Sequence, residues 1–185
     1  MTTTIALRKA SMRTKSLMMV SAVVTAVALP QLFHAVGIAS GAGALLGTTL
    51  LPMHLPVLIA GLLGGPVVGA VAGAVSPVAS IAISGMPTAA VLPFMIVELA
   101  AYGLVGGLLA NARMPLVGKV ILTQIAGRAV RTAAILLAVY GFGSQALPVS
   151  SIWTTVTAAL PGILLQWALV PLLVDRIQQA RGTHD

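Results

Sequence analysis

Residues 50–107 form an almost unbroken apolar stretch that is rich in Gly, Ala and Pro. Only two side chains that can carry charge near neutral pH interrupt it, His54 and Glu98. A membrane-spanning helix needs about 20 apolar residues, so this stretch predicts several spans. A His or Glu within such a span requires an explanation, because a charged side chain is costly inside the bilayer.

The composition of the whole chain agrees with a bilayer environment. Hydrophobic residues make up 58% and charged residues 7%, whereas soluble domains contain roughly 45–50% and 25%. The formal net charge of +7 does not indicate nucleic acid, because the basic residues are spread over both ends, one short loop and one apolar segment. The chain contains no Cys, which excludes disulfides and thiolate metal sites.

The hydrophobic pattern predicts an all-α integral membrane protein with six transmembrane helices. Turns that contain Gly or Pro separate the spans, and Pro66 suits the first position of a helix. The predicted spans are residues 16–36, 48–64, 66–84, 90–110, 117–142 and 152–174. We expect a single membrane domain, with a basic N-terminal segment at 1–15, the bundle at 16–174 and a tail at 175–185.

The basic N-terminal segment precedes an apolar run, which is also the pattern of a signal peptide. Because the rest of the chain is itself a membrane protein, we expect a first helix that is retained. Lys and Arg collect on the cytoplasmic side of membrane proteins. With six spans, the two ends and the loops after the second and fourth spans share one side. All the basic residues outside the spans belong to the two ends and to the region after the fourth span, and the opposite loops carry none. We therefore expect both termini to be cytoplasmic.

Charged side chains within the spans are the sharpest indication of function. At 1.5 Å per residue, Glu98 lies roughly 12 Å from the outer end of its span and Arg131 roughly 16 Å, so one outer cavity can hold both. Arg128 is three residues before Arg131 and shares its helix face. One guanidinium is then in surplus and available to an anionic or polar ligand. An ion pair that only locks two helices together remains the alternative.

His54 lies between Pro52 and Pro56 near the outer start of the second span. The two prolines free backbone carbonyls, which the bilayer tolerates only where they line protein or a water-filled cavity. We expect His54 to hydrogen-bond either a ligand or a loop carbonyl. Neutral imidazole also binds divalent metals, but no second strong ligand lies near His54 in the sequence, so no metal site is predicted.

Three weaker ligand candidates are Tyr102, Gln124 and Met86. Tyr102 and Gln124 are polar groups within spans, and each bonds either a ligand or a neighbouring helix. Met86 belongs to the loop 84–87, which we expect above the cavity mouth. The chain has no P-loop, no H-E-x-x-H and no G-x-S-x-G motif. We therefore predict neither an enzyme nor a cofactor.

Small residues four positions apart recur in three spans, and such stripes let helices approach closely. The pairs are Ala22 and Ala26, Gly69 and Gly73, and Gly103 and Gly107. We expect the glycine pairs to pack inside the bundle.

Several motifs taken together resemble the substrate-binding S component of energy-coupling factor (ECF) transporters. They are P-x-x-F-H at 30–34, LPMHLPVLIAGLLGGPVVGAVAG at 51–73, SGMP at 84–87, ELAAYGLVGGLL at 98–109 and ALPGILLQWALVPLLV at 159–174. The resemblance implies a six-helix subunit of an ABC-type importer in the prokaryotic plasma membrane. Such a subunit captures a vitamin, a vitamin precursor or another micronutrient in an outward-facing cavity with high affinity.

The resemblance also implies partners, namely a membrane coupling subunit and two ATPase subunits. In this family an A-x-x-x-A pattern in the first helix forms the docking face for the coupling subunit, and Ala22 and Ala26 match that pattern. Transport is then expected to occur by toppling of the whole subunit in the membrane.

Other functions remain open from the sequence alone: a non-transporting membrane scaffold, a divalent-metal uptake component and a small intramembrane enzyme. The surplus Arg favours a ligand with a carboxylate or phosphate, such as a pantothenate-like acid. A neutral ligand, such as a cobalamin building block or a pyridoxine-like compound, is the alternative.

Overall fold

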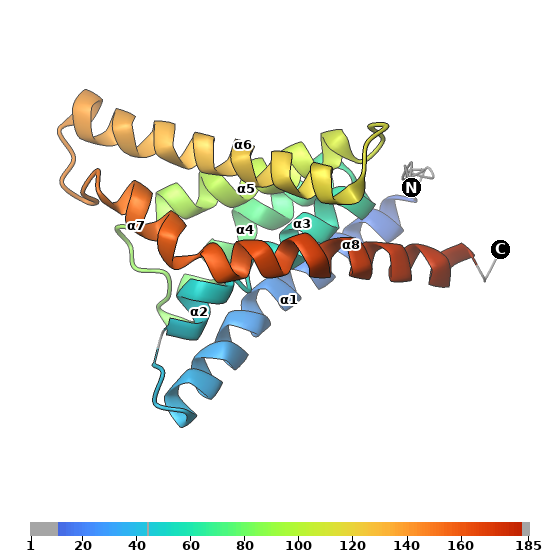
Figure 1. Cartoon of the computed structure of the whole chain (residues 1–185), viewed down its shortest axis with the longest axis horizontal. Helices are drawn as coiled ribbons and strands as arrows, with labels where there is room; N and C mark the ends of the chain where they lie inside the picture. Colours follow the sequence, from blue (N-terminus) through green and yellow to red (C-terminus); the bar gives the residue numbers. More distant parts are fainter. Residues whose placement is uncertain (1–10, 44, 183–185) are drawn as a thin grey trace.

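The computed structural model describes residues 11–43 and 45–182, which form helices and no strand. The elements are α1 (Met12–Ala39), α2 (Leu45–Leu50), α3 (His54–Gly64), α4 (Pro66–Ser84), α5 (Leu92–Leu109), α6 (Leu116–Leu136), the π-helical turn η1 (Leu137–Gly141), α7 (Ser151–Ala158) and α8 (Leu160–Gly182). Helices α3 to α6 and α8 run roughly along the long axis of the molecule, and α1 crosses them obliquely, so that its far end lies away from the other long helices (Figure 1).

Six helical segments of the described chain are long and apolar enough to cross a membrane, which confirms the predicted fold class. They are Met12–Ala39, Leu45–Gly64, Pro66–Ser84, Leu92–Leu109, Leu116–Gly141 and Leu160–Ala180. The first extends three residues beyond its predicted end, because the helix continues through Pro30 to Ala39.

The last predicted span, residues 152–174, is wrong in its bounds. The helix is interrupted at Ala159, and the membrane-length segment begins at Leu160 and ends at Ala180. Pro161 explains the interruption, because Pro fits the first turn of a new helix but removes a hydrogen bond inside a continuous one. Residues 151–158 therefore form the separate short helix α7.

The second span is continuous in hydropathy but broken in structure. Helix α2 ends at Leu50, helix α3 begins at His54, and the three residues between them make a corner. Leu51 adopts a φ of 51°, in the left-handed region that non-glycine residues rarely occupy. Pro52 follows it and cannot supply the N–H that a continuing helix needs. The corner turns the start of α3 toward the middle of the bundle.

Helix α5 is central, because α3, α4 and α6 all pack against it. Glycines make the α4–α5 contact close, as predicted from their spacing. A Cβ atom on Gly103 would overlap the backbone of Gly69, and one on Gly73 would overlap the backbone of Leu99. Tyr102 is the largest buried side chain of α5.

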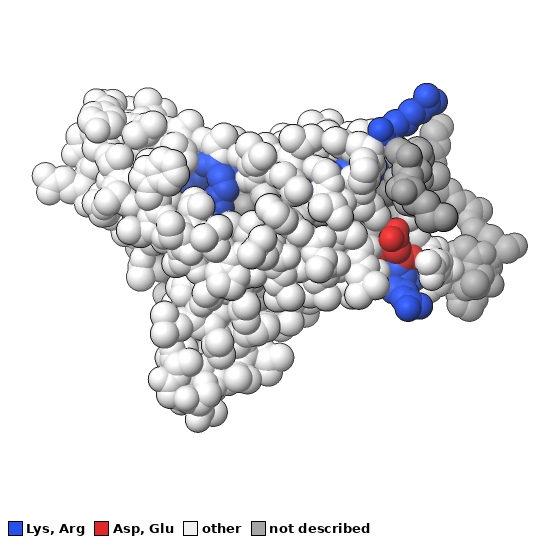
Figure 2. All heavy atoms as spheres, in the orientation of Figure 1, with Lys and Arg blue, Asp and Glu red and all other residues white. Residues whose placement is uncertain are grey.

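Charge separates the two ends of the bundle. Helix α1 begins and α8 ends at the same end of the molecule, together with the turn between α5 and α6 (Figure 1). The basic residues Arg13, Lys15, Arg113 and Arg176 belong to these segments. Figure 2 shows charged atoms at that end and one separate basic patch toward the other end, in a surface that is otherwise uncharged in this view.

Candidate ligand-binding site

A buried cluster of charged side chains joins α3, α5 and α6. Glu98 of α5 is fully buried, and its Oε2 accepts a hydrogen bond of 2.7 Å from Nη1 of Arg131. Nη1 of Arg128 lies 3.3 Å from Oε1 of Glu98, and Nε2 of His54 lies 3.8 Å from the same oxygen. The structure thus brings together the four strongest candidates that the sequence offered.

Tyr102 completes the cluster one turn after Glu98. Its ring meets the ring of His54 edge to face, with centroids 5.1 Å apart and planes at 83°. Gly127 of α6 leaves the space that the Tyr102 ring occupies, because a Cβ atom there would overlap the ring. The Tyr102 ring is therefore held between α3 and α6, next to Arg128.

Hydrogen-bond donors outnumber acceptors in this cluster. The buried atoms of the cluster without a hydrogen bond are both ring nitrogens of His54, the hydroxyl of Tyr102, all three guanidinium nitrogens of Arg128, Nε of Arg131 and one carboxylate acceptor, Oε1 of Glu98. Buried polar groups in native proteins are almost always paired. One carboxylate is therefore shared by two guanidinium groups, and the unpaired donors of the cluster could bind a further hydrogen-bond acceptor.

A cavity of about 370 Å³ reaches this cluster from the end of the bundle that lies opposite the start of α1. His54 and Arg131 form part of its wall, as does Met86 from the segment between α4 and α5. Glu98, Arg128 and Tyr102 lie behind these two and do not line it. The remaining polar lining comes from six residues that the sequence did not single out as strong candidates: Gln31, His34, Thr48, Ser80, Thr88 and Thr155.

Comparison with known proteins identifies the family. Residues 10–174 match the family described as ECF transporter, substrate-specific component. The chain belongs to this family. Neither a curated protein nor a solved structure matches it significantly. The resemblance drawn from the sequence is thus confirmed, and the chain is a multi-pass plasma membrane protein that serves as a substrate-specific transport subunit rather than as an enzyme.

Gln124 of this S component is placed away from the cavity lining. Its Nε2 donates to Oε1 of Gln166 at 2.9 Å, and its Oε1 accepts from the indole Nε1 of Trp167 at 2.6 Å. Both ends of the Gln124 amide therefore bond α8, which is the second of the two roles that the sequence left open for it.

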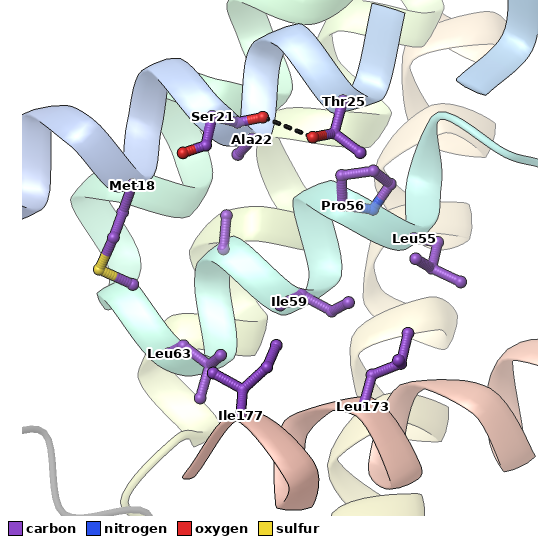
Figure 3. A pocket seen from close by; sticks show the side chains of 11 residues that line it. Met18, Ser21, Ala22, Thr25, Leu55, Pro56, Ile59, Leu63, Leu173 and Ile177 are labelled. Carbon is purple, nitrogen blue, oxygen red and sulfur yellow. Dashed lines mark hydrogen bonds between the residues drawn. The ribbon is translucent and has the colours of Figure 1, made fainter. Parts of the chain in front are cut away.

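The small-residue pair of α1 lies inside the S component rather than on its surface. Ala22 is 8% exposed and Ala26 is 0% exposed, because this face of α1 packs against α3 and α4. Ala22 lines an apolar groove of about 380 Å³ between α1, α3 and α8. Figure 3 shows Ser21 and Thr25 of α1 on one side of this groove and Leu173 and Ile177 of α8 across from them. A partner that contacts Ala22 must enter this groove.

Among the described residues, no three His, Asp or Glu side chains are grouped in a way that would hold a metal ion.

Proposed function

We propose that this S component captures a small anionic micronutrient from the outer side of the membrane. The observation that carries the proposal is the pairing of one buried carboxylate, Glu98, with two guanidinium groups, of which one, that of Arg131, lines a cavity. Arg131 lines the cavity and is the proposed direct contact, with His54 beside it. Arg128 supplies the second positive charge from behind.

The charge balance indicates the ligand class. Glu98 carries one negative charge against two guanidinium groups that lie 3.3 and 2.7 Å from it, so one positive charge is left without a counter-charge in a largely buried cluster. Guanidinium groups bind carboxylates and phosphates with two parallel hydrogen bonds. A ligand with one carboxylate, such as a pantothenate-like acid, would make the site neutral. A divalent cation would instead add to the positive charge, which argues against the metal-uptake alternative.

The proposed partners are a membrane coupling subunit and two ATPase subunits. The chain has no P-loop motif, so ATP would be hydrolysed on separate chains. The groove between α1, α3 and α8 is the proposed docking surface for the coupling subunit, because its lining is largely apolar and it reaches Ala22.

A thermal-shift screen of the purified S component tests ligand capture. The panel contains pantothenate and other small carboxylic acids, with pyridoxine and neutral cobalamin precursors for comparison. A ligand that binds only the folded state stabilises it by about 2.7 kcal/mol at 100 times its Kd. We expect a carboxylic acid to raise the melting temperature without ATP. If a neutral compound raises the melting temperature at least as much as the most stabilising acid of the panel, the assignment of ligand class is overturned.

The substitution Arg131→Met tests the proposed contact. Loss of a charge-assisted hydrogen bond costs about 1.5–3 kcal/mol, so we expect the Kd for the acid found in the screen to rise at least about tenfold. Arg113→Met, in the turn between α5 and α6, is the matched control and should leave the Kd unchanged. Equal binding by both variants would show that Arg131 does not contact the ligand.

Uptake measurements test the partner proposal. Cells that produce the S component and lack every candidate ATPase should accumulate no ligand above background, because the chain has no means of using ATP. Equal uptake in cells with and without the ATPases would reject the ABC-type mechanism, while binding to the purified protein would be unaffected by that result.

A further inference from the structure

The three residues between α2 and α3, together with His54 at the start of α3, supply four consecutive residues of the cavity wall. These residues, 51–54, are called the corner below. Its first residue, Leu51, has a φ of 51°. A non-glycine residue in this region costs about 1–3 kcal/mol and persists only where the surrounding structure holds it. Some part of the molecule must therefore hold the corner in place.

The carbonyl oxygen of Leu51 is where the corner is held. It accepts a hydrogen bond of 3.1 Å from the backbone N–H of His54 and one of 3.2 Å from Nε2 of Gln166. Gln166 belongs to α8 and is 1% exposed. One carbonyl thus links the cavity residue His54 to a side chain that does not line the cavity.

Gln166 is itself held by a chain of side-chain hydrogen bonds. Its Oε1 accepts from Gln124 of α6, and Gln124 accepts in turn from Trp167. These bonds use Nε2 and Oε1 of both amides, so Gln166 can present its Nε2 to Leu51 in only one orientation.

Backbone contact supports the same corner one turn earlier in α8. Gly162 precedes Gln166 by four residues and therefore lies on the same helix face. A Cβ atom on Gly162 would overlap the backbone of Thr49 and Leu50, at the end of α2. Helix α8 thus holds the corner at two points, by close packing at Gly162 and by a hydrogen bond at Gln166.

We propose that Gln166 is a positioning residue for ligand capture, which holds the corner 51–54 and thereby directs His54 toward Glu98 and the cavity. The role in capture rests on the function proposed above. That Gln166 holds the corner in place is independent of the proposed function, and it can be measured without any ligand.

The test is the rate at which diethyl pyrocarbonate modifies His54 in the purified, full-length protein, followed by peptide mass spectrometry. His54 is 3% exposed and both of its ring nitrogens are buried, so it should react slowly in the native structure and faster when the corner opens. In Gln166→Leu, loss of the hydrogen bond to the Leu51 carbonyl should raise that rate about fivefold to tenfold. His34, in the same cavity but on α1, should react at the wild-type rate. Gln179→Leu, an exposed position of α8, is the matched control and should change neither rate.

If Gln166→Leu does not fold, a second variant tests the same chain of hydrogen bonds. Gln124→Leu retains the donor of Gln166 but removes its orienting partner, so we expect a smaller increase at His54. In the double variant the two effects should not add, because both act through one chain of hydrogen bonds. An unchanged His54 rate in the folded variants would overturn the proposal. An equal increase at His54 and His34 would also overturn it, because it would show general loosening.

The two proposals fail separately. If no compound of the panel binds but His54 becomes reactive in Gln166→Leu, the positioning role stands and the proposed function falls. If pantothenate or another acid binds equally to wild type and Gln166→Leu, and His54 stays unreactive in both, the proposed function stands and Gln166 has no positioning role.

Discussion

Glu98 is the residue on which the buried charge balance depends. It is the acidic partner of Arg128, Arg131 and His54, and it is fully buried. Removing one partner from a buried ion pair costs about 3–5 kcal/mol, because it leaves the other charge uncompensated. We expect Glu98→Gln to lower the free energy of unfolding by that order in denaturation measurements in detergent.

Asp175→Asn is the matched control for Glu98→Gln, because it makes the same chemical change near the end of α8 and away from the cluster. It should change the stability by less than about 0.5 kcal/mol. If the two variants unfold alike, Glu98 does not hold the two guanidinium groups in the bundle.

Part of this site was predictable from the sequence. The depth of a residue in a helix follows from its distance to the helix end, so the sequence indicated that one cavity could hold both Glu98 and Arg131 but not which Arg pairs with Glu98. In the structure Arg131 lies 2.7 Å from the carboxylate. That Arg128 also reaches the same carboxylate depends on how α5 and α6 face each other, which spacing along one helix does not determine. His34 lies in the cavity wall with Ser80 and Thr155, which come from distant parts of the chain, so the sequence pattern around His34 does not reveal this position.

At the scale of the elements, the glycines between α4 and α5 set the width of the bundle. Gly103→Ala places a methyl group on the backbone of Gly69, where no side chain can move aside. Overpacking of this kind costs about 1–3 kcal/mol, more than the helix propensity of up to about 1 kcal/mol that Ala gains over Gly. We expect a lower melting temperature.

Gly118→Ala is the matched control in α6. Its Cβ would lie in ordinary contact with the end of the Met114 side chain, at 3.6 Å. This variant should be as stable as the wild type or slightly more stable. An unchanged melting temperature for Gly103→Ala would mean that α4 and α5 separate easily, contrary to the close contact in the structure.

The elements were predictable where hydropathy and small residues decide them, and less so at their breaks. A window of about 20 residues averages over the corner at Leu51 and over the interruption at Ala159. Pro52 and Pro161 mark both places, but Pro is also tolerated within a spanning helix, as Pro30 and Pro77 are here. At the corner, the additional contacts come from α8: Gln166 hydrogen-bonds Leu51 and Gly162 packs on the end of α2. Neither contact can be read from the sequence around Leu51.

At the scale of the whole molecule, the distribution of charge and the position of the cavity together indicate which side of the membrane the cavity faces. Basic residues lie at the end where α1 begins, and the cavity opens toward the opposite end. If the positive end is cytoplasmic, the cavity faces outward, as uptake requires. The orientation is therefore the property that joins the fold to the proposed function.

Single-cysteine labelling measures this orientation directly, and the natural chain has no Cys that would interfere. Gln145→Cys places a thiol in the exposed segment between η1 and α7, and Asn111→Cys places one in the exposed turn between α5 and α6. In right-side-out vesicles, a membrane-impermeant maleimide should label Gln145→Cys at once. It should label Asn111→Cys only after the membrane is permeabilised, and the wild-type chain gives the background. The reverse pattern would place the cavity on the cytoplasmic side, and capture of a nutrient from outside would then be impossible for this geometry.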